Sequence, residues 1–183
     1  MPTFTTLTTP RLLIRRLRES DASALFAYRN DPVVMYYQSW SPADEAAARQ
    51  SIAEMALLEP GDASGFQFAV ELRSEALLIG DLFLRPLEWD ARQMELGYTF
   101  ARERQGQGYA FEATNALLAY CFGEMKLHRI IAITACANVG SVKLLERLKF
   151  RREAHTRQSY LYHGKYEDEY QFALLGEEWE AGL

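Results

Sequence analysis

The sequence lacks any apolar run that approaches the ~18–20 residues needed to span a membrane. Its first residues, Met1–Thr6, contain neither a basic segment nor a long apolar one, so we expect no signal peptide. Only two cysteines are present, Cys121 and Cys136, and their spacing matches neither a metal site nor a C-x-x-C pair. We therefore expect two reduced thiols in a cytoplasmic protein that has no membrane partner.

Histidine is also scarce, and basic residues are outnumbered by acidic ones. The three histidines, His128, His155 and His163, show no spacing typical of metal ligands, so we expect no metal site. The net charge of −5 disfavours nucleic-acid binding, because such binding needs a basic face. The same charge mildly favours a cationic partner.

What the chain does contain is enough apolar residues for one core. It has 183 residues, of which 49% are hydrophobic, and it shows no internal repeat, low-complexity run or long linker. A chain of this length can bury a sizeable core without disulfides. We therefore expect a single domain that spans residues 1–183.

Hydrophobic periodicity predicts that strands and helices are mixed along this domain. The expected strands are 11–17, 66–72, 77–84, 93–100, 129–135 (wholly buried), 150–162 and 166–174, with turns at 74–75 and 163–165. The expected helices are 21–29, 43–58, 108–124 and 138–148. Ser20 and Ser41 are the expected N-caps of the first two helices, and Pro42 opens the second. Hairpins beside one strand–helix–strand unit predict an α+β (mixed α/β) domain around a largely antiparallel sheet.

The most informative segment is the glycine-rich turn between the strand 93–100 and the long helix 108–124. It contains Gln105, Gly106, Gln107, Gly108, Tyr109 and Ala110. Glycine permits close approach of a ligand, and the amides at a helix N-terminus favour an anion, so the turn could hold a pyrophosphate without a basic side chain. The alternative is a tight turn that needs only positive φ angles. Phe111 excludes the G-x-G-x-x-G dinucleotide pattern, and no Gly-Lys-Ser/Thr follows to make a nucleotide-hydrolase phosphate loop.

Several ordered motifs resemble those of one enzyme family. Gln105-x-x-Gly108-x-Ala110 resembles the Q/R-x-x-G-x-G/A pyrophosphate signature of the GNAT N-acetyltransferases, and the string 105–113 resembles its RimJ/RimL version. Further matches lie, in order, at Ile79-Gly80-Asp81, Glu95-Leu96-Gly97-Tyr98, Leu127-His128-Arg129-Ile130, Asn138-Val139-Gly140-Ser141 and Gly164-Lys165-Tyr166-Glu167-Asp168. The resemblance runs from Thr9 to Trp179 and implies a GNAT fold, with its sheet splayed between the fourth and fifth strands.

The resemblance also implies acetyl-CoA as co-substrate. In such folds the pantetheine lies in the splayed gap, which implies main-chain contacts from Tyr98, Thr99 and Phe100, and a backbone N–H in this strand could stabilise the oxyanion. The pyrophosphate is expected to contact the amides of the turn, from Gln105 through Gly106, Gln107, Gly108 and Tyr109 to Ala110. Asn138 and Ser141 are expected at the pantetheine arm and thiol. Lys143 could reach a phosphate or could equally be a solvated surface lysine.

In the reaction that the resemblance implies, an amine attacks the thioester directly and the thiolate leaves. Glu95 is the expected general base, since strand alternation puts it on one face with Gly97 and Thr99. The alternative is an ordinary exposed strand glutamate. Ser141 is the expected proton donor, unless its hydroxyl only bonds back to Asn138 at the helix start. Other candidate donors, which more often serve as packing residues, are Tyr98 and Tyr109.

The acceptor side is less specified. Asp81 and the acidic run Glu167-Asp168-Glu169 could attract a cationic acceptor, or could form a solvated edge-strand face. Met35-Tyr36-Tyr37 and Trp40 could shape the acceptor pocket or belong to a core or dimer surface. Glu112, in the first turns of the long helix, is expected to be structural. The chain could be a monomer or a homodimer.

Three functions stay open on these residues. The first is acetylation of a protein N-terminal α-amine, as in the ribosomal-protein enzymes of the RimJ/RimL group. The second is acetylation of a small amine such as a polyamine, an amino acid or an aminoglycoside. The third is a non-catalytic acetyl-CoA sensor, against which the presence of both Glu95 and Ser141 counts mildly.

One position departs from the group's pattern. The second catalytic helix usually ends in Leu-Gly-Phe, whereas here the residues are Leu148-Lys149-Phe150. If Lys149 adopts the left-handed conformation that glycine would take, we expect a cost on the order of 1 kcal/mol.

Overall fold

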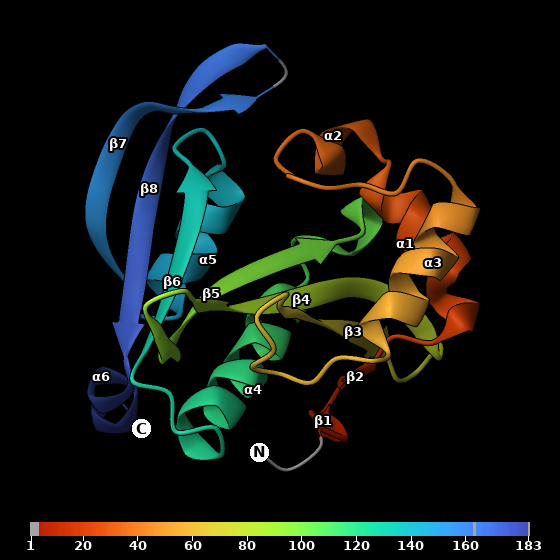
Figure 1. Cartoon of the computed structure of the whole chain (residues 1–183), viewed down its shortest axis with the longest axis horizontal. Helices are drawn as coiled ribbons and strands as arrows, with labels where there is room; N and C mark the ends of the chain where they lie inside the picture. The colour runs from red at the N-terminus through yellow and green to blue at the C-terminus, as the bar shows by residue number, and fades with distance from the viewer. Residues whose placement is uncertain (1–3, 163, 183) are drawn as a thin grey trace.

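The chain folds around an eight-stranded sheet with the order β1-β2-β3-β4-β5-β6-β8-β7 (Figure 1). The computed structural model describes residues 4–162 and 164–182. The strands are β1 (Thr6–Thr8), β2 (Leu12–Arg16), β3 (Phe66–Leu72), β4 (Leu77–Leu87), β5 (Asp90–Phe100), β6 (Arg129–Ala135), β7 (Arg151–Tyr162) and β8 (Lys165–Leu175). Every neighbouring pair is antiparallel except β5 and β6. The expected mixed architecture around a mostly antiparallel sheet is confirmed.

Helices cover both faces of this sheet (Figure 1). They are α1 (Ala22–Arg29), α2 (Pro32–Met35), α3 (Glu45–Met55), α4 (Tyr109–Gly123), α5 (Val139–Arg147), α6 (Gly176–Ala181) and two short 3-10 helices, η1 (Glu19–Asp21) and η2 (Arg102–Arg104). A large apolar cluster joins the sheet to α4 and α5, and a smaller one joins it to α1 and α3. The described residues include no helix long and apolar enough to cross a membrane.

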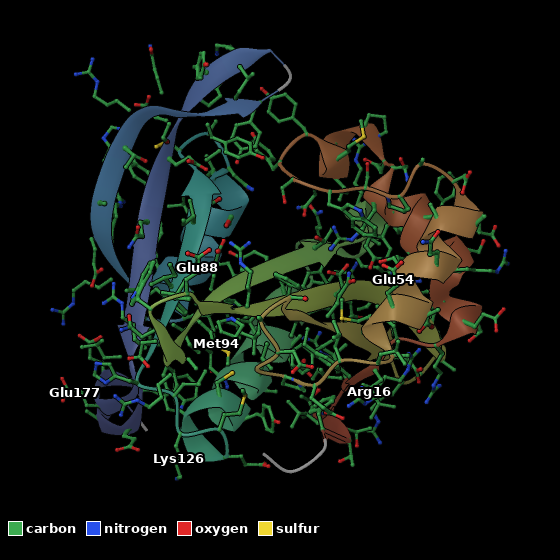
Figure 2. The ribbon with its side chains drawn as sticks, in the orientation of Figure 1. Arg16, Glu54, Glu88, Met94, Lys126 and Glu177 are labelled. Atoms are coloured by element: carbon green, nitrogen blue, oxygen red, sulfur yellow. The ribbon has the colours of Figure 1, made fainter. Side chains whose placement is uncertain are left out.

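Strand alternation decides which side chains face α4 and which face α1 and α3. In β3, Phe66, Phe68 and Val70 enter the large cluster on the α4 side, whereas Ala69 enters the small cluster under α1 and α3. Met94 of β5 is fully buried in the large cluster (Figure 2). Since successive side chains point to opposite faces, Gln67 lies on the same face as Ala69.

The sheet splits where two strands part. The parallel strands β5 and β6 pair at Gln93–Arg129, Met94–Ile130 and Glu95–Ile131 and no further. Beyond Glu95, β5 stays paired with β4 and β6 stays paired with β8. One backbone edge of residues 96–100 therefore has no strand partner among the described residues. This confirms the expected splay, although β1 makes these the fifth and sixth strands.

Two expected helix caps are wrong. The first helix starts at Ala22 after a 3-10 turn that contains Ser20, and the Asp21 carboxylate accepts from the Arg18 amide. The second starts at Glu45, because Asp44 rather than Ser41 accepts from the Ala47 amide, and it ends at Met55. Within residues 4–162 and 164–182 no side chain caps the first helix, whereas the charge of Asp44 strengthens its bond to the exposed Ala47 amide.

Several short elements escaped the sequence pattern. The elements β1, α2 and α6 have three to six residues each, too few to show a period. The strand β6 is not wholly buried, because Ile133 is 45% exposed and faces the split. The expected turn at 163–165 includes His163, which lies outside the described residues.

Candidate active site

Two cavities meet at the split in the sheet. The turn cavity, of about 560 Å³, lies between the glycine turn, the unpaired end of β5 and the start of α5. The strand cavity, of about 520 Å³, lies over β3, β4 and β5 and reaches β6 and the β7–β8 hairpin. Six residues line both cavities: Tyr37, Gln38, Tyr98, Thr99, Asn138 and Ser141. A molecule in one cavity can therefore touch a molecule in the other at these residues.

The turn cavity collects nearly all of the residues expected to bind acetyl-CoA. Its walls include Tyr98, Thr99, Phe100, Gln105, Gly106, Gly108, Tyr109, Ala110, Asn138, Ser141 and Lys143. Gln107 instead lines a neighbouring hollow beside Arg11, whose guanidinium donates to the Gln107 carbonyl oxygen at 3.0 Å. Gln107 therefore lies on the outer side of the turn and does not line the turn cavity.

The glycine turn has the backbone geometry that glycine favours. Gly108 is the N-cap of α4 with φ 81°, and Gly106 has φ 72°. A Cβ at Gly106 would meet nothing within 4 Å, so this glycine is needed for its φ angle and not for space. No side chain of the described residues caps α4. The first amides of a 15-residue helix therefore point at the turn, as an anion site requires.

Glutamine side chains brace this turn. The Gln105 side-chain amide donates to the Phe100 carbonyl oxygen at 2.9 Å, and that of Gln107 donates to the Glu103 carbonyl oxygen at 2.8 Å. The Gln105 main-chain amide donates to the Arg102 carbonyl oxygen at 3.2 Å, so the expected contact from Gln105 is wrong, whereas the Gln107 main-chain amide is available to a ligand.

Basic side chains also surround the turn, which the sequence reasoning missed. Arg104 lines the turn cavity and is held by both oxygens of Glu75, at 3.0 and 2.7 Å. Arg147 lies over the Phe111 ring at 4.0 Å and lines the same cavity. Arg104 directly precedes the motif at Gln105, so the sequence could have predicted its place beside the turn. Arg147 lies on α5, and its place beside the turn is visible only in the structure.

The junction of the cavities contains a pair of hydroxyls. The Tyr98 and Ser141 oxygens lie 2.7 Å apart, and either can donate. Burial raises the pKa of Tyr98 well above its usual value, and the hydrogen bond from Ser141 only partly offsets this. Tyr98 therefore keeps its proton at neutral pH. The pair is a chain of protonated oxygens at the point where both cavities open.

Asn138 leaves the serine hydroxyl available for this pair. Its side-chain oxygen accepts from the Ser141 main-chain amide at 3.2 Å and so caps α5. The alternative in which the Ser141 hydroxyl bonds back to Asn138 is wrong, because the backbone amide makes that bond. The Asn138 side-chain nitrogen has no partner among the described residues.

Glu95 lies on the floor of the strand cavity. It faces the same side as Gly97 and Thr99, as strand alternation requires. Its side chain is half-buried, and one carboxylate oxygen accepts from Arg85 at 2.6 Å. The other oxygen has no hydrogen bond to a described residue. Glu95 is thus a fixed carboxylate inside a cavity, which differs from an ordinary exposed strand glutamate.

Asp81 is not part of a solvated face, as the sequence alternative had it. It is completely buried, where it accepts a hydrogen bond from the Tyr28 hydroxyl and pairs with Arg29 through both oxygens. Arg29 also donates to the Trp40 carbonyl oxygen at 3.1 Å and lies 5.0 Å from that ring. This buried charge cluster fixes the loop that contains Gln38, which in turn accepts from the Thr99 hydroxyl at 2.8 Å.

Aromatic rings join the two sides of the strand cavity. Tyr36 and Tyr37 lie 4.8 Å apart, and both approach Tyr162 of the β7–β8 hairpin within 6.5 Å. Figure 1 shows that the hairpin tip curves toward α2. Burial and the nearby Glu169 carboxylate raise the pKa of Tyr162 to about 12. Tyr162 therefore keeps its proton at neutral pH. Tyr37 and Trp40 of the expected aromatic group line the strand cavity, whereas Met35 and Tyr36 do not.

The other acidic residues have separate roles. Glu112 accepts from the Thr9 hydroxyl at 2.6 Å and from the Arg11 amide and guanidinium at 3.0 and 2.6 Å, which supports its structural assignment. Asp168 pairs with His155 at 2.7 Å on the surface. Of the acidic run, Glu169 lines the strand cavity. Among the described residues, no group of three or more His, Cys, Asp or Glu side chains could hold a metal ion.

Comparisons with known proteins agree with this geometry. Residues 11–151 match the family model described as an acetyltransferase (GNAT) domain. The chain is 35% identical to the uncharacterized N-acetyltransferase YnaD of Bacillus subtilis, over 94% of this chain and 98% of that protein. It is 29% identical to the ribosomal protein uS5-alanine N-acetyltransferase of Escherichia coli, over 96% of this chain and 93% of that protein. The crystal structure of a GNAT-family acetyltransferase from Bacillus anthracis matches with a TM-score of 0.83 and 32% identity, over 95% of this chain and 100% of that chain. The chain therefore belongs to the GNAT family and is an acetyl-CoA-dependent N-acetyltransferase.

Proposed function

We propose that the chain moves the acetyl group of acetyl-CoA to the α-amine at the N-terminus of a protein. One observation carries this proposal. The turn cavity and the strand cavity meet at the Tyr98–Ser141 hydroxyl pair, and Glu95 lies on the strand-cavity side of that junction. A donor and an acceptor amine in the two cavities would meet beside a base and a proton source.

The turn cavity fits the co-substrate. Acetyl-CoA supplies the activated acetyl thioester. The turn residues 106–110 offer main-chain amides to its pyrophosphate, and Lys143 and Arg147 add positive charge around it. The unpaired backbone of Tyr98, Thr99 and Phe100 offers its peptide groups to the pantetheine arm, and Asn138 offers its side-chain nitrogen.

Glu95 takes the proton from the acceptor amine through a water molecule. A protein N-terminal amine has a pKa of roughly 7.7–8.0, against about 10.4 for lysine. About a tenth of the α-amine is then neutral at pH 7, so a carboxylate held by Arg85 suffices as the base. A backbone N–H on the open edge of β5 stabilises the oxyanion. Ser141, backed by Tyr98, returns a proton to the leaving thiolate.

The charge of the strand cavity favours a single ammonium group. Its two arginines, Arg29 and Arg85, are matched by Asp81 and Glu95. Glu169 then supplies one further negative charge. One net charge suits an α-amine on a neutral peptide, whereas a polyamine would present additional ammonium groups that need partners.

A panel of acceptors tests the proposal. We would follow thiol release from acetyl-CoA with short peptides that carry free Ala, Ser or Met N-termini, and with spermidine, free amino acids and an aminoglycoside. Peptides with a blocked N-terminus and an internal lysine are the matched control. We expect release with the free N-termini and none with the blocked peptides. Release with small amines alone would replace the proposal with the small-amine function.

A further inference from the structure

Gln67 places an unpaired side-chain amide inside the strand cavity. The residue lies on β3, is 5% exposed and lines the cavity. Its main-chain N–H donates to the Met55 sulfur at 3.1 Å, which holds the end of α3 over β3. Neither its side-chain oxygen nor its side-chain nitrogen has a hydrogen bond to a described residue.

Both polar atoms of this amide are open to the cavity, because neither is among the enclosed side-chain atoms that lack a partner in the described residues. A polar atom in such a place bonds either to water or to an occupant of the cavity. A second polar group lines the same cavity, since the Ser51 hydroxyl on α3 faces it and also has no bond to a described residue. Met55 and Phe83 supply the apolar surface around them. These two polar groups are therefore available to hydrogen-bond an occupant of the cavity.

The strand register places Gln67 at a defined distance from the reacting centre. Gln67 lies opposite Phe83, and Phe83 lies opposite Gly97, which is on β5 between Glu95 and Thr99. Two strand spacings separate Gly97 from Gln67, or roughly 9–10 Å. An extended peptide advances about 3.3–3.6 Å per residue, so the second or third residue of an acceptor comes within hydrogen-bonding reach of Gln67.

The chemistry of the amide narrows the class of group that it binds. A carboxamide presents one acceptor oxygen and two donor hydrogens, which complement the N–H and C=O of a peptide group. We infer that Gln67, with Ser51, binds a main-chain peptide group near the second residue of the acceptor and so selects peptidyl amines over plain alkylamines. This inference rests on the proposed function and adds a specificity-determining residue to it.

The variant Gln67→Met tests the inference, because methionine has a similar length and no hydrogen-bonding amide. We would compare kcat/KM for a free N-terminal tripeptide amide and for propylamine, with acetyl-CoA binding measured separately. For the tripeptide we expect a fall of roughly 5- to 100-fold, mainly through KM, which corresponds to about 1–3 kcal/mol. Propylamine turnover and acetyl-CoA affinity should stay within about twofold.

Two further readouts separate a binding role from a structural one. The matched control Gln50→Met removes an exposed α3 amide that bonds Glu54 and should change none of these values. The melting temperature of Gln67→Met should equal or exceed that of the wild type, because an unpaired amide is removed; a clear fall would show a structural partner and overturn the inference.

The kinetic outcomes also distinguish the inference from the proposed function. If the wild type acetylates the tripeptide and Gln67→Met does so equally well, the inference fails and the proposed function stands. If the wild type acetylates propylamine but not the tripeptide, the inference is overturned together with the proposed acceptor.

Discussion

The two cavities are built in different ways. The anion site of the turn cavity consists of backbone groups, with two glycines at positive φ, the first amides of α4 and the unpaired edge of β5. The strand cavity is formed by side chains from separated segments and is underpinned by the buried charges of Asp81 and Arg29. A backbone site needs particular residues in one short stretch, whereas a side-chain site can be assembled from anywhere in the chain.

That difference explains why the turn cavity, and not the strand cavity, could be predicted from the sequence. Residues 105–110 are contiguous, and glycine is required there by the φ angle. By contrast, Gln67, Arg85 and Tyr162 meet only after the sheet has formed. Because a fold alone does not specify a substrate, the acceptor has to be argued from the geometry of the strand cavity.

The largest effect is expected from removing the charge beneath the strand cavity. Asp81→Asn leaves the Arg29 guanidinium buried without its counter-ion, which should lower the free energy of unfolding by about 3–5 kcal/mol. Denaturant unfolding monitored by circular dichroism measures this loss. A loss of this size would show that the segments around the strand cavity depend on the buried Asp81–Arg29 pair.

An exposed carboxylate on the β7–β8 hairpin provides the control. Asp168→Asn breaks the pair with His155 on the surface, where solvent screens the charges, and should leave the unfolding midpoint nearly unchanged. Equal losses in the two variants would contradict the distinction between a charge-supported cavity and its solvated surroundings.

The next effect concerns the base in the strand cavity. Glu95→Gln should lower kcat for a peptide acceptor on the order of 100-fold at pH 7, while acetyl-CoA binding in the turn cavity is preserved. Because the α-amine is mostly neutral at pH 9, the deficit should narrow there. Stopped assays of acetylated peptide between pH 6.5 and 9 measure both values.

A second cross-strand arginine–glutamate pair serves as the matched control. Glu153→Gln removes the carboxylate that pairs with Arg129, away from both cavities, and should leave kcat unchanged. A Glu95→Gln deficit that stays constant up to pH 9 would assign Glu95 to positioning rather than to proton transfer.

Sequence reasoning reached most strands and helices through periodicity and the turn through a local backbone demand, whereas the split followed from the family resemblance. It missed α2 and β1, which are too short to show a period. It misplaced Asp81, since a single aspartate in a strand carries no sign of the Arg29 that arrives from α1. It also left Gln67 unnoticed, because an unpaired amide is visible only once its neighbours are known.

The smallest effect lies on the turn-cavity side, at the end of α5. Lys149 has φ 69° and ends the helix. Its main-chain amide donates to the Glu146 carbonyl oxygen at 3.1 Å, and the Phe150 amide donates to the Leu145 carbonyl oxygen at 3.0 Å. This is the conformation expected from the missing glycine. Lys149→Gly should therefore raise the free energy of unfolding by about 0.5–1 kcal/mol, since relief of the left-handed strain exceeds the added entropy of the unfolded chain.

The same exchange inside the helix should have the opposite sign. Lys143→Gly, within α5, should lower the free energy of unfolding by about 1 kcal/mol, because glycine disfavours a helix interior. Thermal unfolding of both variants would show melting temperatures displaced in opposite directions, by about 2–4 °C for each 1 kcal/mol in a chain of this size. If both variants lose stability, the backbone at Lys149 is not strained. The end of α5 beside the turn cavity then depends on side chains, as the strand cavity does.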